Sequence, residues 1–385
     1  MSKTTTSMIA KDVAAQLARG MTLQPDGLLQ ALPDMTIKVC SNSAPLLEKL
    51  RAYFKHIVVS GAVPTPTPTP TATIEIHAFE CPPPDLDVVY IDWPREAGKS
   101  GRKDAYVDLA DGRIVKKVRT GMVFLQSRDH VIAAGPCLEN DNQVINFINA
   151  QYMNWLQQDG WAICHAAGLV RNGRALGLAG FSGGGKSTLM LHMLDETGTA
   201  FLSNDRLFVR HCDGDVWAAG IPKLPRINPG TALNNPRLDT IVSPARRAEL
   251  AALPTAELWD IEEKYDVDIE KIYGPERITA RAPLCGFLIL NWSHDADTPP
   301  QITQVDLAAR RDLLAAVMKS PGPFYQRADG SMFESDQALD EDAYLAVFDR
   351  VPIFEVTGRV NFDEIARQCS AQIFDKGQLN KGVQA

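Results

Sequence analysis

The sequence predicts an α/β protein with a phosphate-binding loop in a mixed β-sheet, preceded by a smaller α+β domain. Residues 180–188 read Gly-Phe-Ser-Gly-Gly-Gly-Lys-Ser-Thr, which matches the pattern G-x-x-x-x-G-K-[ST]. An apolar run at 175–179 precedes this loop and residues 189–194 continue as a helix, so strand, loop and helix follow in the order that the motif requires. The chain has 385 residues, enough for two domains with separate cores.

Residues 1–145 predict an α+β domain to which the sequence assigns no role. Helices are expected at 8–20 and 44–54, where apolar residues recur at helical spacing. Strands are expected at 35–39, 57–59, 74–78 and 88–91, followed by a β-meander at 104–109, 113–119 and 122–126. Residues 64–71 alternate proline and threonine, which favours polyproline II and excludes a sheet interior, so they are predicted to be a surface spacer.

Residues 146–385 predict the phosphate-loop domain, and a helix at 142–158 is expected to join the two domains. Asn-Gly at 172–173 is a strong turn signal between apolar runs at 162–170 and 175–179. The strand before the loop should therefore pair antiparallel with its predecessor, which makes the sheet mixed. Further strands are predicted at 200–203, 207–209, 286–291 and 352–356, and helices at 307–318 and 362–373.

The composition narrows the class of protein. The net charge of −8 argues against a nucleic-acid binder, because such proteins are usually basic. No run of 18 apolar residues occurs and the first 20 residues lack an apolar signal segment, so neither a membrane partner nor secretion is expected. The seven cysteines are scattered without a C-x-x-C pair, which favours free thiols and predicts no zinc site of regular spacing. A cytoplasmic location is the expectation.

The phosphate loop carries the chemistry of nucleotide binding. Its glycines allow consecutive backbone N–H groups to point at phosphate oxygens without Cβ clashes. Lys186 is expected to reach the β- and γ-phosphates, Ser187 to complete a Mg²⁺ shell, and the following helix to add its positive N-terminal end. The predicted nucleotide contacts are Gly180, Ser182, Gly183, Gly184, Gly185, Lys186, Ser187 and Thr188. ATP and Mg²⁺ are the expected cofactors.

Two titratable residues are candidates for handling the proton of a phosphoryl acceptor. Asp205 follows an apolar strand, and a carboxylate at a strand end beside a phosphate loop is well placed as a metal ligand or base. A turn aspartate is the alternative, because Asn-Asp pairs are common in turns. His165 lies in the neighbouring predicted strand, where a structural histidine is the alternative to a catalytic one.

Cationic residues after the loop are candidates for a substrate or charge clamp. Residues 220–231 contain three prolines and two glycines, which fix an irregular loop that carries Lys223, Arg226 and Asn228. Fixed cations of this kind suit phosphate or an anionic substrate, and a solvated rigid connection is the alternative. Arg277 is a further candidate for neutralising charge, against a plain surface role.

Taken in order, these motifs resemble the HPr kinase/phosphorylase family, bacterial phosphate-loop kinases akin in structure to phosphoenolpyruvate carboxykinases. The family's strand with His-[GA] corresponds to residues 165–166, its loop G-x-S-G-x-G-K-[ST] to 180–187, and its strand end Asp-Asp-Arg to Asn-Asp-Arg at 204–206. The loop Lys-Leu-Pro-Arg-Ile-Asn-Pro-Gly at 223–230 is similar to that of an HPr-kinase-related subgroup. The resemblance covers mainly 165–206 and implies a kinase fold and a homo-oligomer such as a hexamer.

The sequence departs from the family at one position that matters for chemistry. The family's first aspartate, which takes the acceptor proton, is Asn204 here, and an amide cannot accept a proton as a carboxylate can. This leaves Asp205 as base, or His165, or a mechanism that relies on positioning. The family's Glu-[IV]-Arg-Gly segment is absent, and the loop at 223–230 stands in its place.

Two functions of different class follow. The first is an ATP-dependent kinase that transfers the γ-phosphoryl group to a hydroxyl acceptor, either a protein serine or a sugar-like small molecule, with Ser187 and Asp205 holding Mg²⁺. The second is a nucleotide-gated regulatory protein without phosphotransfer, which Asn204 favours. A degenerate scaffold is disfavoured because every phosphate-contacting position is intact. A transport-type ATPase and a GTPase are disfavoured because no Leu-Ser-Gly-Gly-Gln or Asn-Lys-x-Asp segment occurs.

Overall fold

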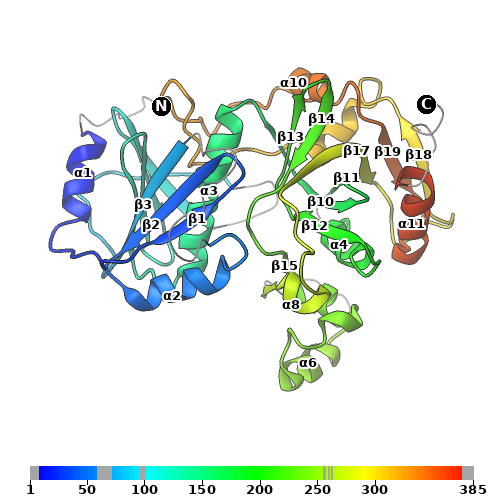
Figure 1. Cartoon of the computed structure of the whole chain (residues 1–385), viewed down its shortest axis with the longest axis horizontal. Coiled ribbons are helices and arrows are strands. Elements are labelled where there is room, and N and C mark those ends of the chain that lie inside the picture. Colours follow the sequence, from blue (N-terminus) through cyan, green and yellow to red (C-terminus); the bar gives the residue numbers. More distant parts are fainter. Residues whose placement is uncertain are drawn as a thin grey trace. The chain divides into compact units, whose positions relative to one another are not determined.

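The computed structural model describes residues 8–58, 72–95, 101–181, 183–254, 257–258, 261 and 263–374. The chain divides into two compact units, each built on a large mixed sheet, so the fold is mixed α/β (Figure 1). The first unit contains Met1–Asp159 and Pro321–Ala338, and the second contains Gly160–Ser320 and Leu339–Ala385.

The division of the chain differs from the expected one. A boundary after residue 145 would cut α3 (Asp141–Gln158), which packs entirely in the first unit, so the chain leaves that unit only after Asp159. Residues 321–338 then return to the first unit. Sequence periodicity could not reveal this return, because the segment is irregular and contains no helix or strand.

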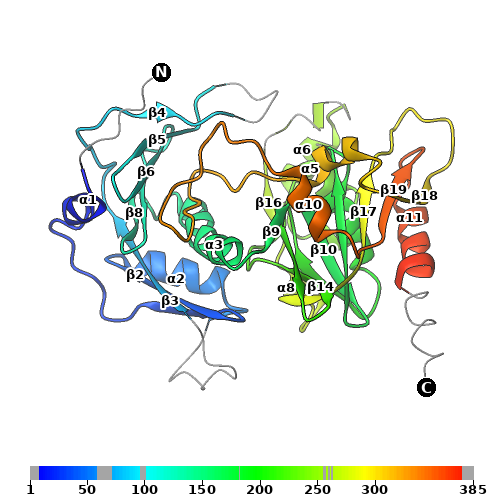
Figure 2. The same cartoon turned by 90° about the horizontal axis from the view of Figure 1, so that it is seen from above.

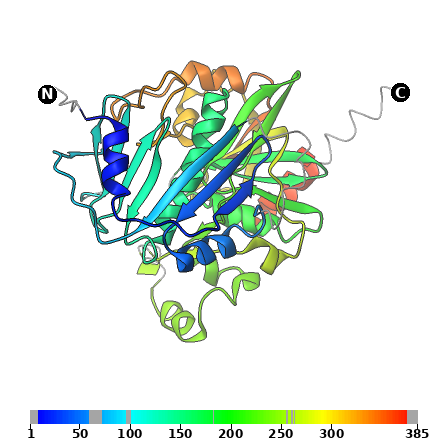
Figure 3. The ribbon, with the colours of Figure 1, turned by 60° about the vertical axis from the view of Figure 1, so that its left-hand side comes forward.

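In the first unit, eight strands of the described residues form one sheet in the order β1-β2-β3-β8-β7-β6-β5-β4. Their bounds are β1 (Leu28–Ala31), β2 (Met35–Ser41), β3 (Ala72–Glu80), β4 (Ile91–Asp92), β5 (Asp104–Asp108), β6 (Gly112–Lys117), β7 (Val123–Ser127) and β8 (Val131–Gly135). The predicted meander is confirmed, since β5, β6, β7 and β8 pair antiparallel in succession. Strands β2 and β3 run side by side and parallel, and β3 is also parallel to β8 (Figure 3).

Helices cover both faces of this sheet. Helix α1 (Ala10–Leu17) shares a buried cluster with Leu125, whereas Phe124 packs on Phe147 of α3 with ring centroids 4.9 Å apart. Because neighbouring strand residues point to opposite faces, α1 and α3 lie on opposite sides of the sheet (Figure 2). Helix α2 (Ala44–Tyr53) packs beside α3, and its N-terminus is capped by the hydroxyl of Ser43.

In the second unit, nine strands of the described residues form the main sheet, in the order β12-β10-β11-β17-β14-β13-β9, with β19 also paired to β17 and β18 paired to β19. Their bounds are β9 (Ala162–Cys164), β10 (Ala166–Arg171), β11 (Arg174–Gly180), β12 (Thr199–Ser203), β13 (Leu207–Cys212), β14 (Asp215–Ala219), β17 (Arg281–Leu290), β18 (Gln301–Val305) and β19 (Ile353–Thr357). The predicted hairpin is confirmed: β10 and β11 are antiparallel, and the turn residues Asn172 and Gly173 both have positive φ, at 52° and 70°. Strand β11 is parallel to β17, so the sheet is mixed as predicted.

The helices of this unit form two layers. Helices α4 (Lys186–Met193) and α11 (Phe362–Cys369), with the π turn η3 (Ser370–Phe374), share one buried cluster. Helices α9 (Leu314–Val317) and α10 (Glu341–Val347), with the turn η2 (Arg311–Leu313), share the cluster on the other face. Between β14 and β17 the chain forms β15 (Arg226–Ile227), α5 (Pro229–Leu233), η1 (Pro236–Leu238), α6 (Pro244–Ala251), β16 (Tyr265–Asp266) and α8 (Ile269–Tyr273). No helix within the described ranges combines the length and the apolar character needed to span a membrane.

Some expected elements of the first unit differ from the structure. Residue 58, in the strand expected at 57–59, makes only an isolated bridge with Gln30. The strand expected at 88–91 is reduced to Ile91–Asp92, because residues 82–90 hold prolines and aspartates that do not join a ladder. The spacer predicted at 64–71 lies outside the described residues.

In the second unit, the helix expected at 307–318 is broken. Its first part is a turn in which the Asp306 carboxylate accepts the backbone N–H of Ala308, and such local bonding competes with a helix. Only the short η2 and α9 follow. The strand expected at 162–170 is also interrupted, since His165 turns its backbone N–H to the Val317 carbonyl, 2.7 Å away.

A buried arginine fixes residues 321–338 to the first unit. Arg113 on β6 is 1% exposed, and its guanidinium donates to the carbonyls of Phe333 at 2.9 Å and Pro323 at 3.2 Å. It also pairs with Asp108 at 2.6 Å. The charge of this side chain is therefore buried with partners on all sides, as a buried cation requires.

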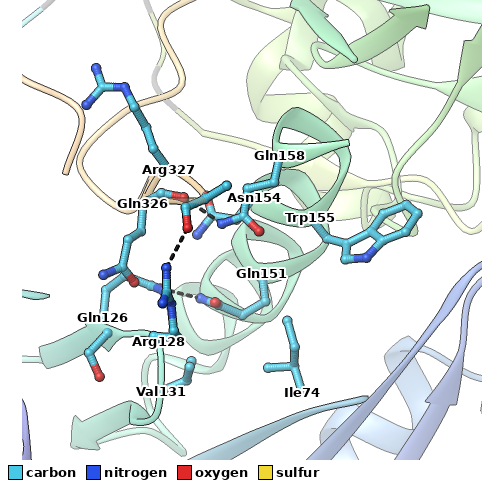
Figure 4. A pocket seen from close by; sticks show the side chains of 12 residues that line it. Ile74, Gln126, Arg128, Val131, Gln151, Asn154, Trp155, Gln158, Gln326 and Arg327 are labelled. Atoms are coloured by element: carbon cyan, nitrogen blue, oxygen red, sulfur yellow. Dashed lines mark hydrogen bonds between the residues drawn. The ribbon is translucent and has the colours of Figure 1, made fainter. Parts of the chain in front are cut away.

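Polar side chains around a cavity of about 140 Å³ add to this anchoring (Figure 4). Gln151 on α3 donates to the Gln126 side chain at 2.8 Å, and Arg128 donates to the Ala328 carbonyl at 2.5 Å. The cavity lies within the first unit, and its polar groups bind one another and the backbone of residues 321–338. These bonds therefore help to hold residues 321–338 on the first unit.

We expect Arg113→Met to lower the free energy of unfolding of the first unit by about 2–4 kcal/mol, because two buried carbonyls and Asp108 lose their partner. Urea unfolding followed by circular dichroism measures this. The control is Arg102→Met, which removes a surface pair with Asp92 whose side chains are 60% and 50% exposed, and should change little. Equal effects of both substitutions would contradict the anchoring role.

Candidate nucleotide-binding site

The phosphate loop joins the end of β11 to the start of α4. Gly183 and Gly185 have φ of 78° and 83°, values that favour glycine, and Gly185 is the N-cap of α4. A Cβ at Gly185 would also lie 2.8 Å from the ring of Phe362. The backbone N–H of Gly184 donates to the Phe181 carbonyl at 2.9 Å, which closes the loop. Ser182, a predicted nucleotide contact, lies outside the described residues.

The three residues that open α4 are each engaged by a neighbour. The Lys186 ammonium donates to the Gly180 carbonyl at 2.8 Å. The Thr188 hydroxyl lies 3.0 Å from that of Thr231. Burial lowers the pKa of Lys186 to about 8, helped by the charge of Lys319 and opposed by that of Asp205. An anion that binds next to such a lysine stabilises its charged form and raises its pKa again.

The Ser187 hydroxyl donates to the Asn204 side-chain oxygen at 2.8 Å. Two neighbouring ligands of an octahedral Mg²⁺ at 2.0–2.1 Å lie about 2.9 Å apart, so this oxygen pair fits one edge of a magnesium shell. Asp205 was the expected second ligand, but the structure brings Asn204 against Ser187. The Asn204 amide therefore lies on the phosphate-loop side of the site.

Asp205 points to a different set of partners. Its φ is 70°, which is uncommon for a residue other than glycine and follows the end of β12. One carboxylate oxygen lies 3.3 Å from His165 Nε2 and 3.4 Å from the Lys319 ammonium, and the other lies 3.3 Å from the Arg206 guanidinium. The structure thus brings Asp205 and His165, the two candidates for handling an acceptor proton, into contact, and their role stays a prediction.

These partners determine the charge state of Asp205. Burial raises its pKa, but the hydrogen bond from His165 and the charges of Arg206 and Lys319 outweigh that effect and hold the pKa well below its usual range. The side chain is still 43% exposed, so solvent screens part of each pairing. Asp205 is thus an ionised carboxylate of low basicity, suited to orienting a group more than to removing its proton.

Lys319 was not found by the sequence reasoning. It follows α9, next to Met318, which bridges to Cys164, and this brings it beside His165 and Asp205. The position is 114 residues from Asp205 along the chain, and no local pattern marks it.

The cationic loop at 220–231 contributes one residue to the site. Burial lowers the pKa of Lys223 to about 8, the charges of Arg206 and Arg226 add to this, and Asp205 opposes it. Lys223 therefore lies within electrostatic range of the Asp205 carboxylate. Arg226 instead pairs with Asp266 at 3.0 Å, across the β15–β16 ladder. The Asn228 oxygen accepts a hydrogen bond from Lys264. Arg226 and Asn228, both predicted to clamp substrate, therefore bind side chains of the segment between β14 and β17.

The expectation that Arg277 clamps a substrate is corrected by the structure. Its guanidinium donates to four backbone carbonyls, those of Leu194, Glu196, Thr199 and Tyr273. Leu194 is the C-cap of α4, at the end of the helix opposite to the phosphate loop. Arg277 neutralises the negative end of that helix, a structural role.

Aromatic side chains that the sequence did not single out support the loop. Trp292 Nε1 donates to the Gly184 carbonyl at 2.9 Å, and its ring meets Phe362 edge to face at 5.1 Å. Phe362 in turn fills the space beside Gly185. Phe181, within the loop, exposes 41% of its surface. Trp292 and Phe362 therefore support the loop at Gly184 and Gly185, whereas the loop is exposed to solvent at Phe181.

The comparisons with known proteins find distant structural similarity alone. No protein-family model and no curated protein matches this sequence. Among solved structures, the HPr(Ser) kinase/phosphatase from Coxiella burnetii matches with 9% identity and a TM-score of 0.29, covering 58% of this chain and 99% of the other. These values correspond to a distant relation at most, so any functional argument depends on the geometry of the site.

We expect the affinity for Mg·ATP to fall as the pH rises above about 8. Lys186 and Lys223, with pKa values of about 8, lose their charge there. A bound anion should raise both pKa values, because a nearby negative charge favours the charged lysine. Affinity should fall by up to about tenfold per pH unit for each lysine between its free and bound pKa. Calorimetric titration from pH 7 to 10 measures this. Lys223→Met should make the dependence shallower, and a flat profile would contradict the assignment.

We expect Arg277→Met to lower the melting temperature while leaving the Kd for Mg·ATP within about twofold, because the residue acts at the far end of α4. Lys223→Met is the matched comparison and should raise the Kd by about tenfold. Differential scanning fluorimetry and calorimetry separate the two effects. A tenfold loss of affinity in Arg277→Met at unchanged stability would restore the clamp role.

Proposed function

We propose that the chain is an ATP-dependent kinase that transfers the γ-phosphoryl group to a hydroxyl acceptor. The observation that carries this proposal is the pairing of two features in one unit. A complete phosphate loop presents Lys186 and Ser187, and the carboxylate–imidazole pair Asp205–His165 lies within electrostatic range of Lys186. Phosphoryl transfer requires this combination of phosphate binding and acceptor positioning.

The charge balance of the site supports a polyphosphate ligand. Lys186, Arg206, Lys223 and Lys319 all interact electrostatically with the Asp205 carboxylate. Burial lowers the pKa values of Lys186 and Lys223 to about 8, so an added negative charge would stabilise their charged forms. The phosphates of ATP would supply the missing negative charge, with Lys186 exchanging the Gly180 carbonyl for a phosphate oxygen.

Ser187 and Asn204 would hold Mg²⁺, consistent with their 2.8 Å oxygen pair. When bound, the ion neutralises charge that develops on the phosphates. The remaining work falls to the protein. Lys186 orients the phosphates, while Lys319 and Arg206 keep Asp205 ionised and directed toward the acceptor.

For the transfer itself, the acceptor oxygen forms a bond to the γ-phosphorus, and the bond to the bridging oxygen breaks, leaving ADP with the electron pair. The acceptor's proton passes to the Asp205–His165 pair and then to solvent. Because the carboxylate has a low basicity, Asp205 is better suited to orienting the hydroxyl than to taking its proton, and His165, 3.3 Å away, helps to position it. A loose transition state needs little base catalysis, so positioning supplies most of the effect. The acceptor is a protein serine or a sugar-like small molecule.

A nucleotide-gated regulatory protein is the second candidate. It is favoured by Asn204, an amide where the related kinases carry a carboxylate, and by the low basicity of Asp205. In that case the Lys186 ammonium would leave the Gly180 carbonyl to bind a nucleotide phosphate, and no acceptor would be phosphorylated.

The test is ATP turnover by the purified protein with Mg²⁺, with and without fractionated cell metabolites and proteins. We expect acceptor-stimulated turnover that falls by about 10²–10³-fold in Lys186→Ala. Asp205→Asn should retain ATP binding and lose about 10²-fold in turnover. Lys11→Ala, on the exposed side of α1, is the control and should behave as the wild type.

The outcomes separate the candidates. Tight, Lys186-dependent ATP binding without stimulated turnover would establish the nucleotide-gated protein. Absence of ATP binding would overturn both.

A further inference from the structure

A cysteine, a glutamate and a histidine gather on the sheet of the first unit. Cys40 lies on β2, and Glu75 and His77 lie on the parallel neighbour β3. The register places Cys40 opposite His77 and Lys38 opposite Glu75. One ligand atom from each of Cys40, Glu75 and His77 lies within 4.8 Å of the other two. The proposed kinase chemistry, which belongs to the second unit, uses none of them.

We propose that Cys40, Glu75 and His77 form a Zn²⁺ site with one coordination position left open. Thiolate, imidazole and carboxylate are the three ligand types that zinc takes in proteins, and three protein ligands plus a solvent position is a known arrangement for this ion. Harder ions such as Mg²⁺ and Ca²⁺ prefer oxygen ligands only, so this mixed set selects against them.

The geometry is close to what the ion requires. In a tetrahedral site, ligand atoms at zinc distances of 2.0–2.3 Å are separated by about 3.3–3.6 Å. His77 Nε2 and Glu75 Oε1 are 2.9 Å apart and hydrogen-bonded, so this pair must open slightly while the sulfur approaches. The parallel register already places Cys40 opposite His77. The His77 ring also packs on Phe79, with centroids 5.7 Å apart, which holds its orientation.

Lys38 acts as a cation already present in the cluster. Its ammonium lies 2.9 Å from the second oxygen of Glu75 and interacts electrostatically with the Cys40 thiol. The Lys38 side chain is 47% exposed, so it can turn to solvent at little cost when an ion enters. Lys38 therefore competes with a metal ion for the Glu75 carboxylate and the Cys40 sulfur.

The thiol must lose its proton when zinc binds. Cys40 is 7% exposed, and burial together with Glu75 raises its pKa, while Lys38 acts in the opposite direction.

The experiment is a titration of metal-free, full-length protein with CoCl₂, because Co²⁺ bound to a thiolate gives a sulfur-to-metal charge-transfer band. We expect one Co²⁺ per chain with this band and with the ligand-field spectrum of a tetrahedral site, both displaced by ZnCl₂. Cys40→Ser and His77→Gln should abolish the band. Cys81→Ser, at the half-buried cysteine that follows β3, is the matched control and should keep it.

A second substitution tests the site in the opposite direction. Lys38→Met removes the competing cation while keeping the length of the side chain, and should tighten Co²⁺ binding by about tenfold. A variant that gains affinity cannot be explained by misfolding. No charge-transfer band at saturating Co²⁺, a band that persists in Cys40→Ser, or unchanged affinity in Lys38→Met would each overturn the proposal.

Discussion

The site in the second unit depends on one carboxylate. Asp205 acts electrostatically on Lys186, Arg206, Lys223 and Lys319, and it contacts two of these cations and His165 directly. Without this charge the cations would repel one another across a partly buried site, and two of them already have lowered pKa values. The electrostatic surplus that remains is what suits the site to an anionic ligand.

Backbone conformation at the end of β12 separates two roles between neighbouring residues. In a regular strand, successive side chains point to opposite faces, and the positive φ of Asp205 changes this relation further. Asn204 thereby meets Ser187 on the phosphate-loop side, while Asp205 meets His165 and Lys319. A residue other than glycine in this conformation carries a cost in free energy, which the ion pairs around its side chain offset.

Residues 321–338 return to the first unit because their backbone groups find hydrogen-bond partners there. Residues 321–338 lack regular secondary structure, so their backbone groups need partners from elsewhere. Arg113 and the carboxamides of α3 provide these partners. Lys319 stands two residues before this passage begins, so the same stretch of chain serves the phosphate site and the anchoring in turn.

The sequence by itself determined the features that depend on local chemistry. The Asn-Gly turn, the meander and the strand–loop–helix order at residues 175–193 follow from neighbouring residues, and the structure confirms them. The nucleotide contacts of the loop stay a prediction. Tertiary structure alone decided the features that join distant positions: Lys319 beside Asp205, Asn204 against Ser187, and Arg277 at the end of α4. Cys40 meets His77 only through the parallel register of two strands, a pairing that no spacing along the chain encodes.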